Sequence, residues 1–218
     1  MWNESIVAIN KYLAHTVGKD AELTTGVPPT KFRVTVPELW YGHADMNSGE
    51  RKDTTYGALD AFFPAILALS GDLTRATRLQ KSSYKMWMKQ SIEPEEIDYL
   101  TMDVKSPGYP LRPEIVESTY YLYHYAATRS SGAKSTADLD PEQYQEKAAM
   151  MWKDFVTHCR TDEGYAALKS VVTKEKSDSM QSFLFAETFK YFYLLFAPPR
   201  TLDFDRVIFN TEAHPIRR

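Results

Sequence analysis

"LRPEIVESTYYLYHY", residues 111–125, joins a helix start to two carboxylates and an aromatic run. Pro113 suits the first position of a helix, and the residues after it predict a helix rich in tyrosine. Glu114 and Glu117 are one helical turn apart, so they share one face, and Arg112 could pair with either. Acids near a helix start commonly do no more than complement the helix dipole, for about 0.3–1 kcal/mol each. A chemical role for these glutamates therefore needs support from other parts of the chain.

The composition indicates a globular chain and argues against two classes of partner. Of 218 residues, 43% are hydrophobic, which is enough to bury a core. The formal net charge is -3 and no basic run occurs, so neither nucleic acid nor a membrane surface is an expected partner. No apolar stretch approaches the roughly 20 residues of a membrane span, and "MWNESIVAIN" lacks the features of a signal peptide. Cys159 is the only cysteine, which excludes an internal disulfide and a CxxC site.

The hydrophobic periodicity predicts a mainly helical chain in which helices alternate with short β connections. The most apolar helices come as every second one, which fits a toroid of helical hairpins with buried inner helices. The chain is short for a closed toroid, so we expect a partial toroid with one exposed apolar flank. Pro64 should kink its helix or set the first turn. Predicted helices cover 3–17, 54–73, 72–91, the stretch after 113, 141–160 and 179–196; hairpins or extended segments cover 31–50 and 162–180, and loops cover 103–113 and 130–141.

Further acids lie inside aromatic-rich segments. Glu187 belongs to the apolar helix segment "SFLFAET", where a carboxylate is costly unless it has a partner or a function. Glu212 and His214 belong to "NTEAHP" near the end of the chain. Aromatic rings stack on sugar faces and acids transfer protons, so these segments together predict a carbohydrate-binding pocket.

Four other residues have ordinary structural interpretations that we favour. A single histidine beside a proline, such as His214, is more often a hydrogen-bonding residue than a base or ligand. His43 with Asp45 resembles a metal-binding pair only superficially, because polar residues are common in loops. Cys159 is most simply a small buried side chain.

The segments "LRPEIVESTYYLY", "SFLFAETFKYFYLLF" and "FNTEAHP" resemble three signature blocks of glycoside hydrolase family 47, the class I α-1,2-mannosidases. "MNSGERKDTTYGALDAFFP" and "ALSGDL" resemble the ER degradation-enhancing α-mannosidase-like branch of that family. The resemblance runs over about residues 1–218. It implies an (α/α)7 barrel that removes terminal α-1,2-linked mannose from high-mannose N-glycans with inversion, with Ca²⁺ as cofactor, in the ER or Golgi and in glycoprotein quality control.

The resemblance also implies roles for individual residues. Glu114 of "RPE" matches the general base that activates the attacking water, and Thr211 of "NTEAHP" matches the residue that binds Ca²⁺ through its hydroxyl and carbonyl. Ca²⁺ takes about 6–8 oxygen ligands, which agrees with a site built from threonine, acids and water. The remaining matches are Glu117, Glu187 and Glu212 as acids that line the sugar subsite and hold the ion's water shell, Arg112 as a substrate contact, and Phe183 as the ring beneath the mannose.

An inverting glycosidase needs a second carboxylic acid about 6.5–9.5 Å from the base. The resemblance places that acid in the N-terminal half of the barrel, and this chain matches the C-terminal half, so the missing half is an expected partner. Two hypotheses follow. Either the chain is half of a glycan-trimming mannosidase domain, or it is a lectin-like fragment that binds mannose glycans without hydrolysis.

Overall fold

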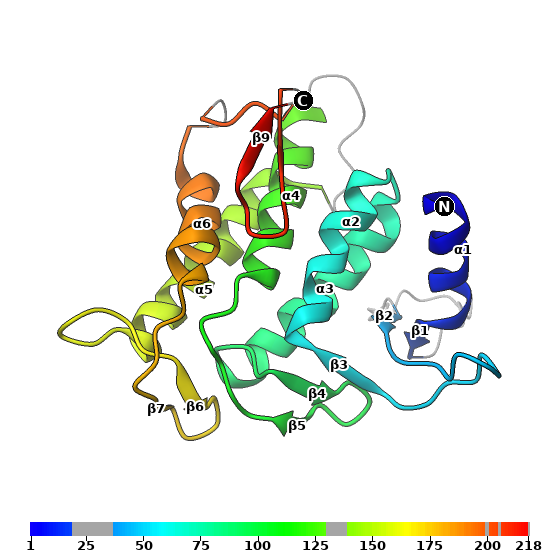
Figure 1. The fold of residues 1–218 in the computed structure, drawn as a ribbon, viewed down its shortest axis with the longest axis horizontal. Coiled ribbons are helices and arrows are strands. Elements are labelled where there is room, and N and C mark those ends of the chain that lie inside the picture. Colours follow the sequence, from blue (N-terminus) through cyan, green and yellow to red (C-terminus); the bar gives the residue numbers. More distant parts are fainter. Residues whose placement is uncertain (19–36, 130–138, 199–200, 205, 218) are drawn as a thin grey trace, which may run out of the picture.

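Helix α4 (Glu114–Arg129) lies at the centre of the structure, and helices on two sides pack against it (Figure 1). The structure is a computed structural model that describes residues 1–18, 37–129, 139–198, 201–204 and 206–217. On one side α4 contacts α2 (Phe63–Leu69) and α3 (Leu73–Gln90), and on the other it contacts α5 (Pro141–Cys159) and α6 (Phe189–Phe196). The predicted mainly helical fold class is confirmed.

Aspartate side chains cap the N-termini of the long helices α3 and α5. The side chain of Asp72 accepts the backbone N–H of Arg75 at 3.1 Å, and Asp140 accepts that of Glu142 at 3.0 Å. Each bond satisfies a donor that the first turn of a helix leaves free. Helices α3 and α5 therefore agree with the predicted ranges within about two residues.

Buried hydrogen bonds fix how α3 packs on α4. The amide Nε2 of Gln80 donates to Thr119 Oγ1 at 3.0 Å and to the carbonyl of Ile115 at 3.2 Å. The Tyr84 hydroxyl bonds the same Thr119 oxygen at 2.8 Å. Because unpaired polar groups in a core are costly, this pairing sets the register between the two helices and so the position of the α4 start.

Short antiparallel strands connect the helices, as predicted, and those within residues 55–106 and 168–176 lie beyond the helix ends in the lower part of Figure 1. The hairpin expected over 162–180 is confirmed as β6 and β7. Of the segment 31–50, residues 31–36 lie outside the described residues, and the rest forms β2 and a tight loop closed by a bridge between Ala44 and Arg51. The pairings are β1 (Ala14–Val17) with β2 (Glu38–Tyr41), β3 (Thr55–Gly57) with β4 (Glu96–Asp98) and β5 (Asp103–Ser106), β6 (Leu168–Ser170) with β7 (Glu175–Lys176), and β8 (Val207–Phe209) with β9 (Pro215–Arg217).

Several predicted helix boundaries are wrong. The first helix, α1 (Trp2–Tyr12), ends five residues early, because residues 14–17 pair with β2 as a strand. The stretch 54–73 splits into β3, a 3-10 helix η1 (Ala58–Phe62) and α2, with Pro64 in the first turn of α2. The last helix begins only with a π-helical turn, η2 (Leu184–Thr188). In α4 the carbonyl of Pro113 accepts the N–H of Glu117 at 2.7 Å, so Pro113 is the capping residue and not the first helical one.

An apolar flank is exposed on α6, as expected for a partial toroid. Phe185 and Tyr193 are exposed, and a groove of about 500 Å³ runs along this face. Its walls are Trp152, Phe189, Phe192, Tyr193, Phe196, Ala197 and Pro198. Among the helices of the described ranges, none has the length and hydropathy needed to cross a bilayer.

Candidate active site

Three segments that are distant in sequence gather at the start of α4. The loop after α3 is tied to it by an ion pair between Glu95 and Arg112. Helix α6 is tied to it by the Tyr191 hydroxyl, which donates to Glu117 Oε1 at 2.9 Å. The β8–β9 hairpin is in turn tied to α6, because Lys190 Nζ donates to the carbonyl of Ala213 at 2.6 Å. In Figure 1 the tip of this hairpin reaches down between α6 and the beginning of α4. The structure thus brings together the predicted site segments.

Glu114 and Glu117 are both partly buried. Oxygen Oε2 of Glu114 is buried and has no hydrogen-bond partner among the described residues. Burial raises the pKa of Glu114 to about 7, although the positive charge of Arg112 acts in the opposite direction. Burial also raises the pKa of Glu117 to about 7, against the hydrogen bond from Tyr191. Carboxyls that exchange protons near neutral pH are suited to general acid or base chemistry.

Arg112 pairs with neither Glu114 nor Glu117, so that prediction is wrong. Its Nε and Nη2 donate to Oε1 and Oε2 of Glu95 at 2.8 and 2.9 Å. This bidentate ion pair fixes the plane of the guanidinium group. The guanidinium carbon Cζ lies 5.8 Å from the centre of the Phe183 ring. Arg112 and Phe183 therefore do lie together, as the prediction of a shared sugar subsite requires.

Sequence reasoning missed Glu93 and Glu95, which lie in the loop "SIEPEE" (91–96). Three acids in four positions right after a helix read as a solvated turn, yet Glu93 is 0% exposed. The available signal was the placement of Glu93 between Ile92 and Pro94, because an apolar residue and a rigid proline around an acid indicate a buried loop.

The backbone just before Arg112 is strained. Leu111 is fully buried and has a φ of 68°, a left-handed conformation that costs a non-glycine residue about 1–3 kcal/mol. Its carbonyl accepts a hydrogen bond from Thr188 Oγ1 at 2.8 Å, which holds this geometry in place. The strain turns the chain sharply, so that Arg112 faces Glu95 and α4 can begin two residues later.

The remaining predicted residues lie at the tip of the β8–β9 hairpin and beside it. Thr211 and Glu212 are exposed, and Asn210 Oδ1 organises the tip by accepting the N–H groups of Glu212 and His214 at 3.0 and 2.8 Å. Burial raises the pKa of Glu187, and the negative charge of Glu212 raises it further, so these acids are near each other. The His214 side chain is exposed, and its Nδ1 lies 3.7 Å from Oε2 of Glu212. Within the described ranges, no cluster of three or more His, Cys, Asp or Glu side chains could hold a metal ion.

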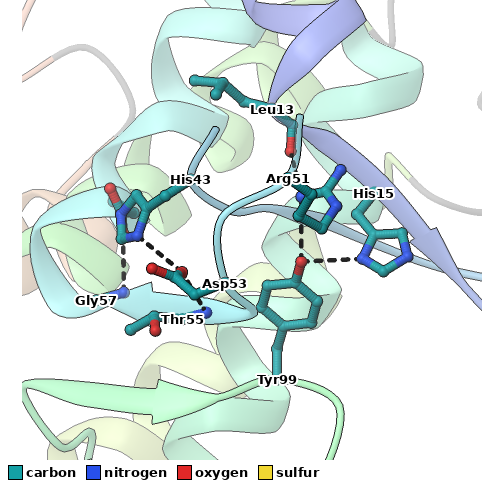
Figure 2. A network of polar contacts seen from close by, with 9 residues as sticks. Leu13, His15, His43, Arg51, Asp53, Thr55, Gly57 and Tyr99 are labelled. Atoms are coloured by element: carbon teal, nitrogen blue, oxygen red, sulfur yellow. Dashed lines mark hydrogen bonds and ion pairs between the residues drawn. The ribbon is translucent and has the colours of Figure 1, made fainter. Parts of the chain in front are cut away.

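A second polar network lies around β3 (Figure 2). His43 Nδ1 is 3.0 Å from Asp53 Oδ1, while Asp45 accepts backbone N–H groups of its own turn, so the favoured structural reading of His43 and Asp45 agrees with the geometry. The Tyr99 hydroxyl lies between His15 Nδ1, at 2.9 Å, and Arg51 Nη1, at 3.3 Å. Together these contacts tie β1 and the 44–51 loop to the three-stranded sheet.

Comparison with known proteins identifies the fold first. Over 98% of this chain, the structure aligns with 45% of the alpha-1,2-mannosidase from Trichoderma reesei, with a TM-score of 0.66 and 24% sequence identity. That likeness confirms the predicted partial toroid of helical hairpins.

The sequence comparisons then give the family. The sequence profile of glycosyl hydrolase family 47 matches residues 1–218, so the chain belongs to that family. It is 33% identical over 180 residues to Alpha-mannosidase I MNS5 of Arabidopsis thaliana, covering 82% of this chain and 29% of that protein. It is 38% identical over 165 residues to ER degradation-enhancing alpha-mannosidase-like protein 3 of Homo sapiens, covering 74% of this chain and 16% of that protein. The chain thus spans less than a third of the length of these relatives.

Proposed function

We propose that this chain is the C-terminal half of a catalytic domain that hydrolyses terminal α-1,2-linked mannose of high-mannose N-glycans on glycoproteins. The observation that carries the proposal is the pair Glu114 and Glu117, two carboxyls on one helix face whose pKa values burial raises to about 7. They lie beside a fixed guanidinium, within a family of glycosyl hydrolases. The names of the relatives, which include ER degradation-enhancing proteins, support a place in the secretory pathway and in glycoprotein quality control.

Glu114 is the proposed general base. Its oxygen Oε2 is buried and has no hydrogen-bond partner among the described residues, so the other carboxyl oxygen is the one proposed to accept a proton from a water molecule. As the water loses its proton it attacks the anomeric carbon from the face opposite the leaving group, which inverts that carbon. Arg112 and Phe183 would orient the sugar, and Glu117, Glu187 and Glu212 would bind its hydroxyls. The acid that protonates the leaving group is proposed to come from sequence beyond this chain.

Ca²⁺ is the proposed cofactor, and the donor chemistry of the residues fits it. Thr211, Glu187 and Glu212 offer only oxygen atoms, the donor type that this hard cation takes. Thr211 would bind the ion through its hydroxyl and carbonyl, and the two acids would hold its water shell. When bound, the ion supplies positive charge that orients sugar hydroxyls. Calorimetry should show Ca²⁺ binding that Thr211→Val abolishes and Thr173→Val, a substitution in the β6–β7 turn, leaves intact. An unchanged heat signal in Thr211→Val would refute the assignment.

The test of activity uses the longer protein that contains this chain, with a high-mannose glycan as substrate. Glu114→Gln should lower kcat by about 10²- to 10⁴-fold, the usual contribution of a general base. Glu175→Gln is the matched control, because Glu175 forms an exposed ion pair with Lys169 on the β6–β7 hairpin. Full activity of Glu114→Gln would reject the proposed base.

The second candidate function is glycan binding without hydrolysis. It is favoured by the Arg112, Glu95 and Phe183 arrangement, which can hold a sugar without any second acid. We expect the 218-residue chain alone to release no mannose, and turnover by it would show that no external acid is needed. Glycan binding by the longer protein with no release of mannose would favour the lectin-like function over the hydrolase.

A further inference from the structure

Among the residues that the structure describes, Glu93 is the most deeply buried acid that the proposed mechanism does not use. It is 0% exposed, and neither of its carboxyl oxygens has a hydrogen-bond partner among the described residues. It lies between two fixed points, since Ser91 ends α3 in a left-handed conformation with a φ of 54° and Glu95 is clamped by Arg112. The loop therefore has little freedom to turn Glu93 toward solvent.

An ionised carboxylate without partners in such a place would be very costly, so Glu93 is expected to carry a proton. Burial raises the pKa of Glu93 well above its ordinary value, and the negative charges of Glu114 and Glu95 raise it further. Arg112 acts in the opposite direction, but its Nε and Nη2 already bind Glu95.

The other titratable groups that face Glu93 do not offer it a charge. Tyr109 and Tyr56 are fully buried phenols whose pKa values burial raises, so both are neutral. The Tyr56 hydroxyl bonds Ser83 at 2.9 Å, and the Tyr109 hydroxyl donates to the carbonyl of Arg112 at 3.2 Å. In the described part of the chain, Glu114 is the one neighbouring acid that also has a buried oxygen without a partner.

We propose that protonated Glu93 donates a hydrogen bond, directly or through one bridging water, to Oε2 of Glu114 and so positions that carboxylate. Of the two carboxyls Glu114 ionises first, while Glu93 keeps its proton. The hydrogen bond favours the charged form of Glu114 and holds its other oxygen toward the sugar. Glu93 is thus a positioning residue, and its role deepens the proposed function, because it acts on the proposed base.

The test compares two substitutions in the 218-residue chain and follows Glu114 directly. Glu93→Gln keeps the shape and an N–H donor, whereas Glu93→Leu keeps only the volume. Titration by NMR with ¹³C-labelled glutamate, assigned with Glu114→Gln, should give the same Glu114 midpoint in Glu93→Gln as in the unchanged chain. In Glu93→Leu the midpoint should rise by about one pH unit, because a hydrogen bond to the charged form is lost.

Two results would overturn the proposal. If neither substitution moves the Glu114 midpoint, Glu93 is only a buried structural residue. If both substitutions lower the midpoint, Glu93 is ionised and repels Glu114. Infrared spectra recorded well above pH 7, where Glu114 and Glu117 are ionised, give an independent readout, because the carbonyl stretch of a protonated carboxyl should be present in the unchanged chain and lost in Glu93→Gln. None of these measurements needs mannosidase activity, so the proposal on Glu93 and the proposed function fail separately.

Discussion

Replacing Glu114 with Gln should make the folded chain more stable at high pH while it removes the proposed base. Burial raises the pKa of Glu114 from its ordinary value of 4.5 to about 7. Each unit of difference between the folded and unfolded pKa corresponds to about 1.4 kcal/mol, so ionised Glu114 lowers the free energy of unfolding by up to about 3 kcal/mol. The folded state binds more protons than the unfolded state between these two values. Stability is therefore lost as pH rises from about 4.5 to about 7 and is constant above.

Urea denaturation followed by circular dichroism at pH 5 and pH 8 measures this difference. Glu114→Gln should raise the free energy of unfolding by about 2–3 kcal/mol at pH 8 and by less than about 1 kcal/mol at pH 5. Glu175→Gln, on an exposed hairpin, should show no such dependence on pH. An equal effect of Glu114→Gln at both pH values would show that burial does not disfavour the charged form, and the reasoning on this site would be refuted.

Three further outcomes test the structure around the site. Thr188→Val should lower the free energy of unfolding by about 1–3 kcal/mol, because it leaves the buried carbonyl of Leu111 without a donor; Thr157→Val, on the exposed face of α5, should cost far less in the same urea titration. Gly42→Ala should cost about 1–3 kcal/mol, measured by the thermal midpoint, because its new Cβ would lie 2.8 Å from the Tyr99 hydroxyl; an unchanged midpoint would show that this contact yields freely. Glu117→Gln keeps an acceptor for Tyr191 and should also stabilise the chain at pH 8 but not at pH 5.

The sequence predicts the helices best where a capping residue and a periodic apolar face agree. Helices α3 and α5 combine both signals, and their predicted ranges agree with the structure. The first helix was predicted five residues too long, because apolar spacing continues past Tyr12 while the pairing of residues 14–17 with β2 is a long-range event. The π-helical turn η2 is likewise set by tertiary contacts such as the bond from Thr188 to Leu111, which no local pattern indicates.

The motif-bearing site residues were predictable from sequence, but their electrostatic partners were not. Glu114 and Glu117 share a face because helix geometry requires it. The partner of Arg112 is Glu95, 17 residues away, and only the packing of α3 on α4 brings the two together. A salt bridge between distant segments has no periodic signature.

The buried acids around the start of α4 lower the stability of the fold, a cost that the proposed function would explain. Glu93, Glu114 and Glu117 all have raised pKa values because of burial, so each would be more stable as a neutral residue. Specific contacts hold this part of the structure in place: the Tyr191 hydroxyl donates a hydrogen bond to Glu117, and Arg112 forms an ion pair with Glu95. A fold under selection for stability alone would lose these carboxyls, whereas a hydrolase needs proton acceptors that work near neutral pH. Neutral substitutions of these acids should therefore raise the free energy of unfolding and lower the activity. Substitutions of purely structural residues do not show this combination.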